Sequence, residues 1–351
     1  MCGPSLGRKR PRRAAIQRRH RHIALQQYAI ALHKKQGPRA LILSRAGLLL
    51  CGLRQLFDVS LHFSAGAVQP SRRNGEYPVS SAVFTATFST DIAAFADRLA
   101  AASARITLPL FRTGLAADDK SADGVFDPVT AADRDAETAM RELIREAFPD
   151  HGIEGEEHDD ERLDADFVWV LDPIDGTRAF IAGLPLWGTL IGLKYRGRPV
   201  FGLLHQPFTG ETFSGSTFSD ETRAALYRRG DTRHDLRTRA RADIGEATLA
   251  TTSPRLFKGA DLDAYDRVER HVRLARYGYD CYAYAMLTAG HLDLVVEAGL
   301  KPCDILPLVP IIEAAGGVVT TWEGAPVTGG GTVVAAGDAR LHAAALALLG
   351  A

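Results

Sequence analysis

Apolar residues recur at helical spacing soon after the first quarter of the chain. Between Thr90 and Leu110 they lie three or four positions apart, which is typical of an amphipathic helix: Ile92, Phe95, Leu99, Ala102 and Ile106. A second helix is predicted from Thr130 to Phe148, where Pro149 ends it. Two amphipathic helices therefore precede the first strands.

Beyond Pro149 the chain alternates between short apolar strands and helices. Strands are predicted at Phe167–Leu171, Thr189–Tyr195, Val200–His205, Ala247–Thr252, Leu292–Glu297, Val318–Thr321 and Thr332–Ala335. Helices are predicted at Cys281–Ala289, Asp304–Ala315 and Asp338–Leu349. Because strands and helices interleave, the pattern indicates a layered α/β fold.

Charge divides the chain into two unequal parts. Residues 1–75 hold 15 Lys and Arg and one acid, Asp58, which gives +14, and the rest of the chain carries −14. We predict that residues 1–88 are a basic N-terminal extension, either disordered or absent from the natural protein because the start codon was assigned too far upstream. A targeting segment and a nucleic-acid-binding arm are the alternatives. The folded domain is predicted at 89–351, in halves of 89–215 and 216–351.

Composition narrows the classes of partner. The acidic body is a poor match for nucleic acid, because phosphate backbones need a basic surface. Four cysteines without a C-x-x-C pair predict a reducing cytoplasm rather than a disulfide framework. No apolar run reaches the roughly 18–20 residues that a membrane span needs, so no membrane partner is expected.

The candidate chemistry centres on the segment DPIDGT. Asp172 and Asp175 follow the apolar strand Phe167–Leu171, and Gly176 and Thr177 come directly after them. Carboxylates at the end of a strand bind hard cations through oxygen, and the N-terminus of a following helix attracts a phosphate. Alone, the segment also fits a surface turn in which Asp172 is a cap. The buried strand and further acids favour a metal site.

Three other acidic positions are candidates for the same site, each with a structural alternative. Glu156, in GEE, could be a third carboxylate ligand or part of a solvated loop. Asp304 opens a predicted apolar helix, where it could be an N-cap, a metal ligand or both. Asp133 lies in the first turn of its helix, a usual place for a capping acid. The neighbours of Glu156 are interpreted as a solvated acidic loop: Asp159, Asp160 and Glu161.

In order and spacing, these segments resemble the inositol monophosphatase family. The series is G-E-E at 155–157, D-P-I-D-G-T at 172–177, and a late P-x-D before an apolar helix and G-G at 302–317. The resemblance runs from about Ser89 to the C-terminus. It implies an αβαβα sandwich of the inositol monophosphatase and fructose-1,6-bisphosphatase type. It also implies a phosphatase that uses two or three Mg2+ ions, with Mn2+ as an alternative, and acts on a small phosphorylated metabolite, commonly as a homodimer.

The resemblance further implies the role of each site residue. The metal ligands would be four carboxylates and one backbone carbonyl: Glu156, Asp172, Asp175, Asp304 and the carbonyl of Ile174. The catalytic residues would be the pair Thr177 and Asp133, which orients or deprotonates the attacking water, and Lys120 on a nearby loop. Gly176 and Thr177 would offer backbone N–H groups to the phosphate. Cys303 stands where the family usually has Trp or Tyr.

Within the family, three segments are most similar to the histidinol-phosphatase branch: residues 172–193, 251–257 and 277–304. This likeness implies that Asp280 and Glu297 face the substrate, and the predicted substrate is L-histidinol phosphate, whose amine and imidazole suit two carboxylates. Asp280 could instead be a helix N-cap. The alternatives are an inositol-1-phosphate phosphatase or a related sugar or nucleotide phosphatase. An alternative of another class is a regulatory or RNA-associated protein that uses its basic N-terminal arm.

Overall fold

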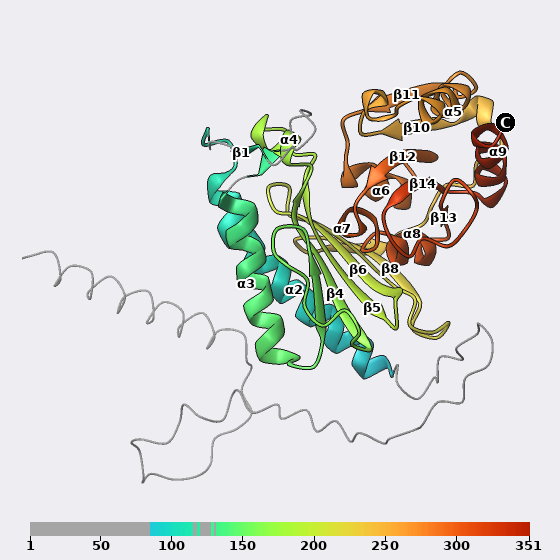
Figure 1. The fold of residues 1–351 in the computed structure, drawn as a ribbon. Coiled ribbons are helices and arrows are strands. Elements are labelled where there is room, and N and C mark those ends of the chain that lie inside the picture. The colour runs from blue at the N-terminus through green and yellow to red at the C-terminus, as the bar shows by residue number, and fades with distance from the viewer. Residues whose placement is uncertain (1–84, 115–117, 120–127, 130) are drawn as a thin grey trace, which may run out of the picture. The chain divides into compact units, whose positions relative to one another are not determined.

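The computed structural model describes residues 85–114, 118, 119, 128, 129 and 131–351 (Figure 1). The described part begins with helix α2 (Ala86–Thr107), whose N-cap Thr85 accepts the N–H of Phe88 at 3.1 Å. The 3-10 helix η1 (Leu108–Leu110) follows. Strands β1 (Asp118–Asp119) and β2 (Pro128–Val129) pair antiparallel, and α3 (Ala131–Ala147) comes next. Both predicted amphipathic helices are confirmed, and α2 begins three residues before the predicted boundary at 89.

The first large sheet has seven strands in sequence order, from β3 to β9. Only its β3–β4 pair is parallel, and the other neighbours are antiparallel. Its strands are β3 (Gly152–Gly155), β4 (Phe167–Asp175), β5 (Gly188–Tyr195), β6 (Arg198–Gln206), β7 (Glu211–Ser216), β8 (Ala224–Arg229) and β9 (Thr232–Asp235). A short helix, α4 (Thr177–Ile181), lies between β4 and β5 in the chain.

The second sheet has five strands in the order β11-β10-β12-β14-β13. Strand β10 runs parallel to β11 and β12, whereas β14 runs antiparallel to β12 and β13. The strands are β10 (Thr248–Thr251), β11 (Leu274–Tyr277), β12 (Leu294–Leu300), β13 (Val318–Thr320) and β14 (Gly331–Ala336). The helices of this half are η2 (Ile244–Glu246), η3 (Pro254–Leu256), α5 (Ala260–Glu269), α6 (Cys281–Thr288), α7 (Pro302–Ile305), α8 (Val309–Ala314) and α9 (Ala339–Leu349).

Helices and sheets alternate in five layers. Helices α2 and α3 cover one face of the seven-stranded sheet, and α7 and α8 pack on its other face (Figure 1). Helices α6 and α8 also contact the second sheet, whose far side is covered by α9, with α5 packed beside α9. The predicted αβαβα sandwich is therefore confirmed.

Apolar side chains fill each of the interfaces between layers. Trp169 and Leu171 of β4 pack against α2 and α3, while Val170, which points to the other face, joins the core between the two sheets. A third cluster lies between the second sheet and helices α5 and α9. The alternation of side chains along β4 thus serves two cores at once.

Two features of the chain differ from the sequence-based expectations. The helix predicted at Asp304–Ala315 is two short helices, α7 and α8, because Pro307 and Pro310 each lack an N–H for a continuous helical ladder. Strands β7, β8 and β9, which the apolar pattern did not indicate, extend the first sheet to Asp235, beyond the expected division of the halves at 215. In the described residues, no helix has both the length and the apolar character to cross a membrane.

His151 directly precedes β3 and lies among aromatic rings. Its ring stacks on Phe148 and Phe167, with centroids 4.6 and 5.0 Å away, and its Nδ1 lies 3.1 Å from the indole nitrogen of Trp169, a donor. Burial lowers the pKa of His151 to about 4. The histidine is therefore neutral in the folded protein over the range where an unfolded chain would protonate it.

We predict that this histidine makes the fold acid-sensitive. Because the pKa is lower in the folded state, the stabilisation is complete above about pH 6.5 and is lost progressively as pH falls from there towards 4. At about 1.4 kcal/mol per pH unit, the loss is at most about 3.5 kcal/mol. We expect the difference in Tm between the wild type and His151→Gln to shrink as pH falls from 6.5 to about 4, because only the wild type loses the contribution of this histidine. A constant difference in Tm would contradict the prediction.

Candidate metal centre

Strand β4 delivers two carboxylates to the C-terminal edge of the first sheet. Asp172 pairs with Leu190 of β5 and Asp175 with Gly188, and the register shifts between them. Asp172 is buried, and its Oδ1 accepts the N–H of Ile174 at 3.0 Å. This irregularity in the ladder turns both carboxylates towards the same region.

Gly176 directly follows these carboxylates and is required there for two reasons. Its φ of 85° lies in the left-handed region, which favours glycine. A Cβ at this position would also lie 3.2 Å from the carbonyl oxygen of Leu186 and 3.3 Å from Cβ of Asp280. The turn between β4 and α4 therefore brings the backbone close to the segments around it, and Thr177 starts α4 as predicted.

Glu156 reaches the site because β3 runs parallel to β4. Gly155 of β3 pairs with Leu171 of β4, so the next residues of the two segments, Glu156 and Asp172, lie side by side. The Glu156 side chain is mostly buried, and its Oε1 lies 3.0 Å from Nζ of Lys301. The alternative in which Glu156 belongs to a solvated loop does not describe this position.

Asp304 comes from α7, on the opposite side of the sheet from α3. It lies at the third position of the helix, not at the N-cap, which is Lys301. Its Oδ2 accepts the backbone N–H of Lys301 at 2.7 Å. The helix segment approaches the sheet closely, because Gly202 and Gly215 lack side chains that would collide with the backbone of Pro307 and Ile311.

These four carboxylates converge. Ligand atoms of Asp172, Asp175 and Asp304 lie within 4.8 Å of one another, and those of Glu156, Asp172 and Cys303 form a second such group. Burial raises the pKa of Asp172 well above its usual range, and the nearby carboxylates raise it further. Burial likewise raises the pKa of Asp175, with Asp280 and Asp304 adding to the effect, and raises that of Asp304 to about 6.

The donor set fits a hard divalent cation. Buried carboxylates at this separation repel one another, and a bound cation would relieve that repulsion. Oxygen is the donor that Mg2+ prefers. The thiol of Cys303 donates weakly to Oδ1 of Asp304 at 3.6 Å, and burial strongly raises its pKa, so it is a protonated neighbour rather than a thiolate ligand.

Asp280 lies beside this cluster in an unusual backbone conformation. It occupies the N-cap position of α6 with a φ of 44°, yet its side chain makes no capping hydrogen bond. The N–H of Cys281 instead donates to Oδ2 of Asp175 at 2.6 Å. Burial raises the pKa of Asp280 to about 6, while Arg178 and a hydrogen bond with Thr252 act in the opposite direction. The N-cap alternative for the Asp280 carboxylate is therefore not what the structure shows.

Glu297, the second predicted substrate-side acid, is almost fully buried and held by two threonines. Its Oε1 accepts the N–H of Thr252 at 2.6 Å and the Thr252 hydroxyl at 3.0 Å, and its Oε2 accepts the Thr251 hydroxyl at 3.0 Å. Burial raises the pKa of Glu297 to about 8 despite these bonds. Glu297 thus fixes Thr252, which in turn contacts Asp280.

The three predicted catalytic residues have different outcomes. Asp133 is buried in the first turn of α3. Thr177 is half-buried, and its hydroxyl donates to the carbonyl of Ile174 at 3.1 Å, the same carbonyl that was predicted as a ligand. Lys120 lies outside the described residues. The roles of all three in water activation stay predictions.

Residues that the sequence analysis did not single out complete the site. Lys301 bonds Glu156 through its side chain and Asp304 through its backbone, and Thr252 links Glu297 with Asp280. Glu161, expected in a solvated loop, is instead bonded by Arg141 and Arg145, so that expectation was wrong. Lys301 could have been found from its position one residue before the P-x-D segment.

Comparison with known proteins agrees with this geometry. A model of the inositol monophosphatase family matches residues 89–350. The chain is 44% identical over 265 residues to the bifunctional phosphatase IMPL2, chloroplastic, of Arabidopsis thaliana, covering 72% of this chain and 73% of that protein. It is 32% identical over 228 residues to a histidinol-phosphatase of Chlorobaculum parvum, covering 64% and 84%.

A solved structure is similar as well. An inositol monophosphatase from Zymomonas mobilis has a TM-score of 0.67 and 41% identity, covering 76% of this chain and all of that one. The chain belongs to the inositol monophosphatase family, whose members are metal-dependent phosphoric monoester hydrolases, typically with Mg2+, that act on small phosphorylated substrates.

Because the clustered carboxylates repel one another, we predict that removing one of them will not lower the stability of the metal-free protein but will weaken metal binding. Asp172→Asn keeps the acceptor for the Ile174 N–H but removes one charge from the cluster. In EDTA we expect its Tm to equal or exceed that of the wild type, because repulsion falls. Added Mg2+ should stabilise the wild type by about 3 kcal/mol at about 100 times Kd, and the variant much less.

The matched control is Asp166→Asn, which removes an exposed carboxylate paired with Arg196 at 3.0 Å. Its Tm should respond to Mg2+ like that of the wild type. Differential scanning calorimetry with and without Mg2+ makes the comparison. An equal rise in Tm for Asp172→Asn and the wild type would remove Asp172 from the set of ligands.

Proposed function

We propose that this chain is a Mg2+-dependent phosphomonoesterase that hydrolyses L-histidinol phosphate to L-histidinol and phosphate, a step of histidine biosynthesis. The observation that carries the proposal is the Asp280 carboxylate. It lies next to the metal-ligand cluster and is not used as a cap. Its carboxylate acts electrostatically on Asp175, and this place beside the cluster suits a substrate whose phosphate lies at the metals and whose cationic amine lies a few bonds away.

The proposed metal ligands are the four clustered carboxylates and the carbonyl of Ile174. Asp172 belongs to both groups of donors, so it would lie at the centre of the set that holds Mg2+. When bound, Mg2+ would neutralise charge on the phosphate and lower the pKa of a nearby water. The fold itself brings carboxylate oxygens within 4.8 Å of one another, so much of the site is organised in advance.

The chain's own groups would bind the phosphate and manage the proton. We assign the N–H groups of Gly176 and Thr177 to the phosphate oxygens, because Gly176 has no side chain to block the approach. The Thr177 hydroxyl would take the proton of the attacking water as it gives its own proton to Asp133, in place of its present bond to the Ile174 carbonyl. Lys120 is assigned to the same water by resemblance.

Glu297 has a different part in the proposal from the one that the sequence suggested. All three of its hydrogen bonds go to Thr251 and Thr252, and its side chain is 1% exposed. We propose that Glu297 sets the position of Thr252, which lies against the Asp280 carboxylate and limits where that carboxylate can lie. The acid that meets the substrate's amine is then Asp280, with Glu297 behind it.

The direct test compares substrates on the full chain. Phosphate release from L-histidinol phosphate, inositol-1-phosphate and fructose-1,6-bisphosphate is measured with Mg2+ and with EDTA. We expect the highest kcat/KM for histidinol phosphate and loss of all turnover in EDTA. A higher kcat/KM for another substrate would keep the phosphatase and discard histidinol phosphate. Turnover that persists in EDTA would contradict metal dependence.

Asp280→Asn separates recognition of the amine from catalysis. The carboxamide keeps the shape and the hydrogen-bonding oxygen but removes the charge. Because hydrogen bonds between charged groups contribute about 1.5–3 kcal/mol, we expect KM for histidinol phosphate to rise at least about tenfold. The kcat/KM for inositol-1-phosphate, which has no cation, should change little and serves as the internal control. An equal loss for both substrates would show that Asp280 supports the site without choosing the substrate.

The RNA-associated alternative has less support. The folded part of the chain matches a family of phosphatases over residues 89–350, and its carboxylate set is complete. That alternative predicts RNA binding that is lost at high salt, with no phosphatase activity. The substrate comparison therefore tests it as well. The homodimer stays a prediction, which sedimentation of the full chain would test.

Two locations in the cell compete. The cysteine content favours the cytoplasm, whereas the similar Arabidopsis protein is named as chloroplastic. Residues 1–75, with 15 Lys and Arg and one acid, have the acid-poor composition of organelle-targeting segments. We propose that a fluorescent fusion of the full chain will separate the two: plastid import would identify residues 1–75 as a targeting segment, and diffuse fluorescence would support the cytoplasm.

A further inference from the structure

Helix α3 carries a charged pair where a globular protein usually has apolar residues. Glu137 is 0% and Arg141 2% exposed, and Nε of Arg141 lies 2.7 Å from Oε1 of Glu137. They share the buried face of α3 with Ala136, Met140 and Ile144. Burying an ion pair costs desolvation of both charges, and an apolar pair of the same volume is often no less stable. Stability alone therefore gives little reason for these two residues.

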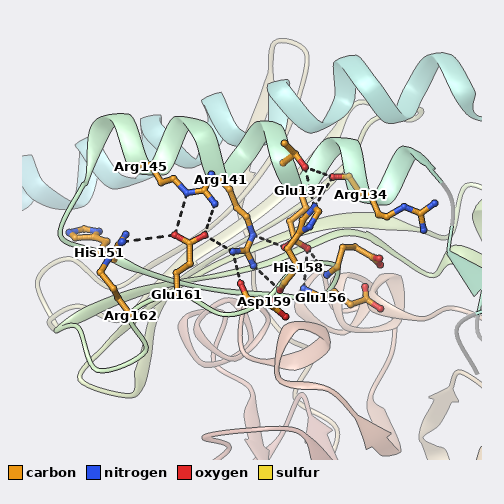
Figure 2. Close-up of polar contacts among 12 residues, drawn as sticks. Arg134, Glu137, Arg141, Arg145, His151, Glu156, His158, Asp159, Glu161 and Arg162 are labelled. Atoms are coloured by element: carbon orange, nitrogen blue, oxygen red, sulfur yellow. Dashed lines mark hydrogen bonds and ion pairs between the residues drawn. The ribbon is translucent and has the colours of Figure 1, made fainter. Parts of the chain in front are cut away.

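The pair is bonded to the segment that carries Glu156. As Figure 2 shows, Glu137 and Arg141 point from α3 towards the segment that follows β3. Oε2 of Glu137 accepts the backbone N–H of Glu156 at 3.1 Å and that of Glu157 at 2.8 Å. Both bonds are charge-assisted, so they restrain the backbone of Glu156 strongly.

Arg141 holds the continuation of the same segment. It donates to the carbonyl of His158 at 3.0 Å, to that of Asp159 at 2.9 Å and to Oε1 of Glu161 at 2.9 Å (Figure 2). Its planar guanidinium thus fixes residues 158–161 from one side. Together the two side chains of α3 set the path of the backbone from Glu156 to Glu161.

Gly155 supplies an independent observation. A Cβ there would lie 2.1 Å from Oε1 of Glu137 and 2.5 Å from Nη2 of Arg141. The backbone of β3 therefore passes directly over the pair, with no space for a side chain. The glycine of the G-E-E segment is explained by the pair and not by its own backbone conformation, since its φ is not in the left-handed region.

We propose that Glu137 and Arg141 are positioning residues that aim the Glu156 carboxylate at the metal cluster. The inference rests on the proposed function, because it takes Glu156 as a ligand. Asp133 lies one helical turn before Glu137, so the same face of α3 presents the proposed proton acceptor and the support of a ligand. The position of α3 would thereby set where Asp133 and the Glu156 carboxylate lie relative to β4.

Glu137→Gln tests the proposal. The carboxamide has the same size, but it has one acceptor oxygen instead of two and no charge for Arg141 or for the two N–H groups. Partners of metal ligands typically contribute 10–100-fold to metal affinity. We expect Kd for Mg2+, measured by calorimetry, and for Mn2+, measured by electron paramagnetic resonance, to rise at least about tenfold. At saturating Mg2+, kcat and KM should return close to the wild-type values.

Arg145→Gln is the matched control. Arg145 lies on the same helix, one turn after Arg141, and bonds the same Glu161, but its side chain is 48% exposed and its hydrogen bonds go to Glu161 rather than to residues 156–159. Its Kd for Mg2+ should stay within about twofold of the wild type. Arg141→Lys, which keeps the charge and loses the planar fork, is the second test variant if Glu137→Gln does not fold.

The outcomes distinguish the inference from the proposed function. If the wild type binds Mg2+ and the test variant binds it equally well with a lower Tm, the pair is merely structural and the inference fails alone. If the wild type binds no Mg2+, the metal site fails and the inference fails with it. A higher Kd for Mg2+ in Glu137→Gln, with normal kcat at saturating Mg2+ and no change in Arg145→Gln, would support both the inference and the proposed function.

Discussion

The repulsion among buried carboxylates at the end of β4 is the constraint on which the rest of the site depends. Asp172 is buried within reach of three other acids, and burial together with their charges raises its pKa. Such a cluster lowers the free energy of unfolding unless positive charge lies nearby. The surrounding protein compensates only part of the negative charge: the ammonium of Lys301 bonds Glu156, and the N–H of Cys281 bonds Asp175. The remaining negative charge is what a divalent cation would neutralise.

Different structural features bring each of these acids to the site. The parallel pairing of β3 and β4 places Glu156 beside Asp172. The close packing of the α7–α8 segment on strands β6 and β7 brings Asp304 from the opposite layer. Because each element is anchored by its own core, the repulsion does not push the carboxylates apart.

The acidic residues around the site therefore have different roles. Some are the proposed ligands, Asp280 is the proposed contact with the substrate's cation, and Glu137 and Glu297 are buried supports that bond to backbone N–H groups. The supports differ from the proposed ligands in what their carboxylates hold: Glu137 bonds the backbone of the segment that carries Glu156, and Glu297 bonds Thr251 and Thr252.

The sequence by itself determined the two leading helices, seven of the fourteen strands in the described residues and the identity of the four clustered carboxylates, because periodicity and the GEE, DPIDGT and P-x-D segments are local signals. It did not determine the break between α7 and α8, the strands β7 to β9 or the true partners of Glu161 and Glu297. Those depend on contacts between residues far apart in the chain. Only the tertiary structure could decide which acids gather in one buried cluster and which bond other parts of the protein, since burial and hydrogen-bond partners are set by packing.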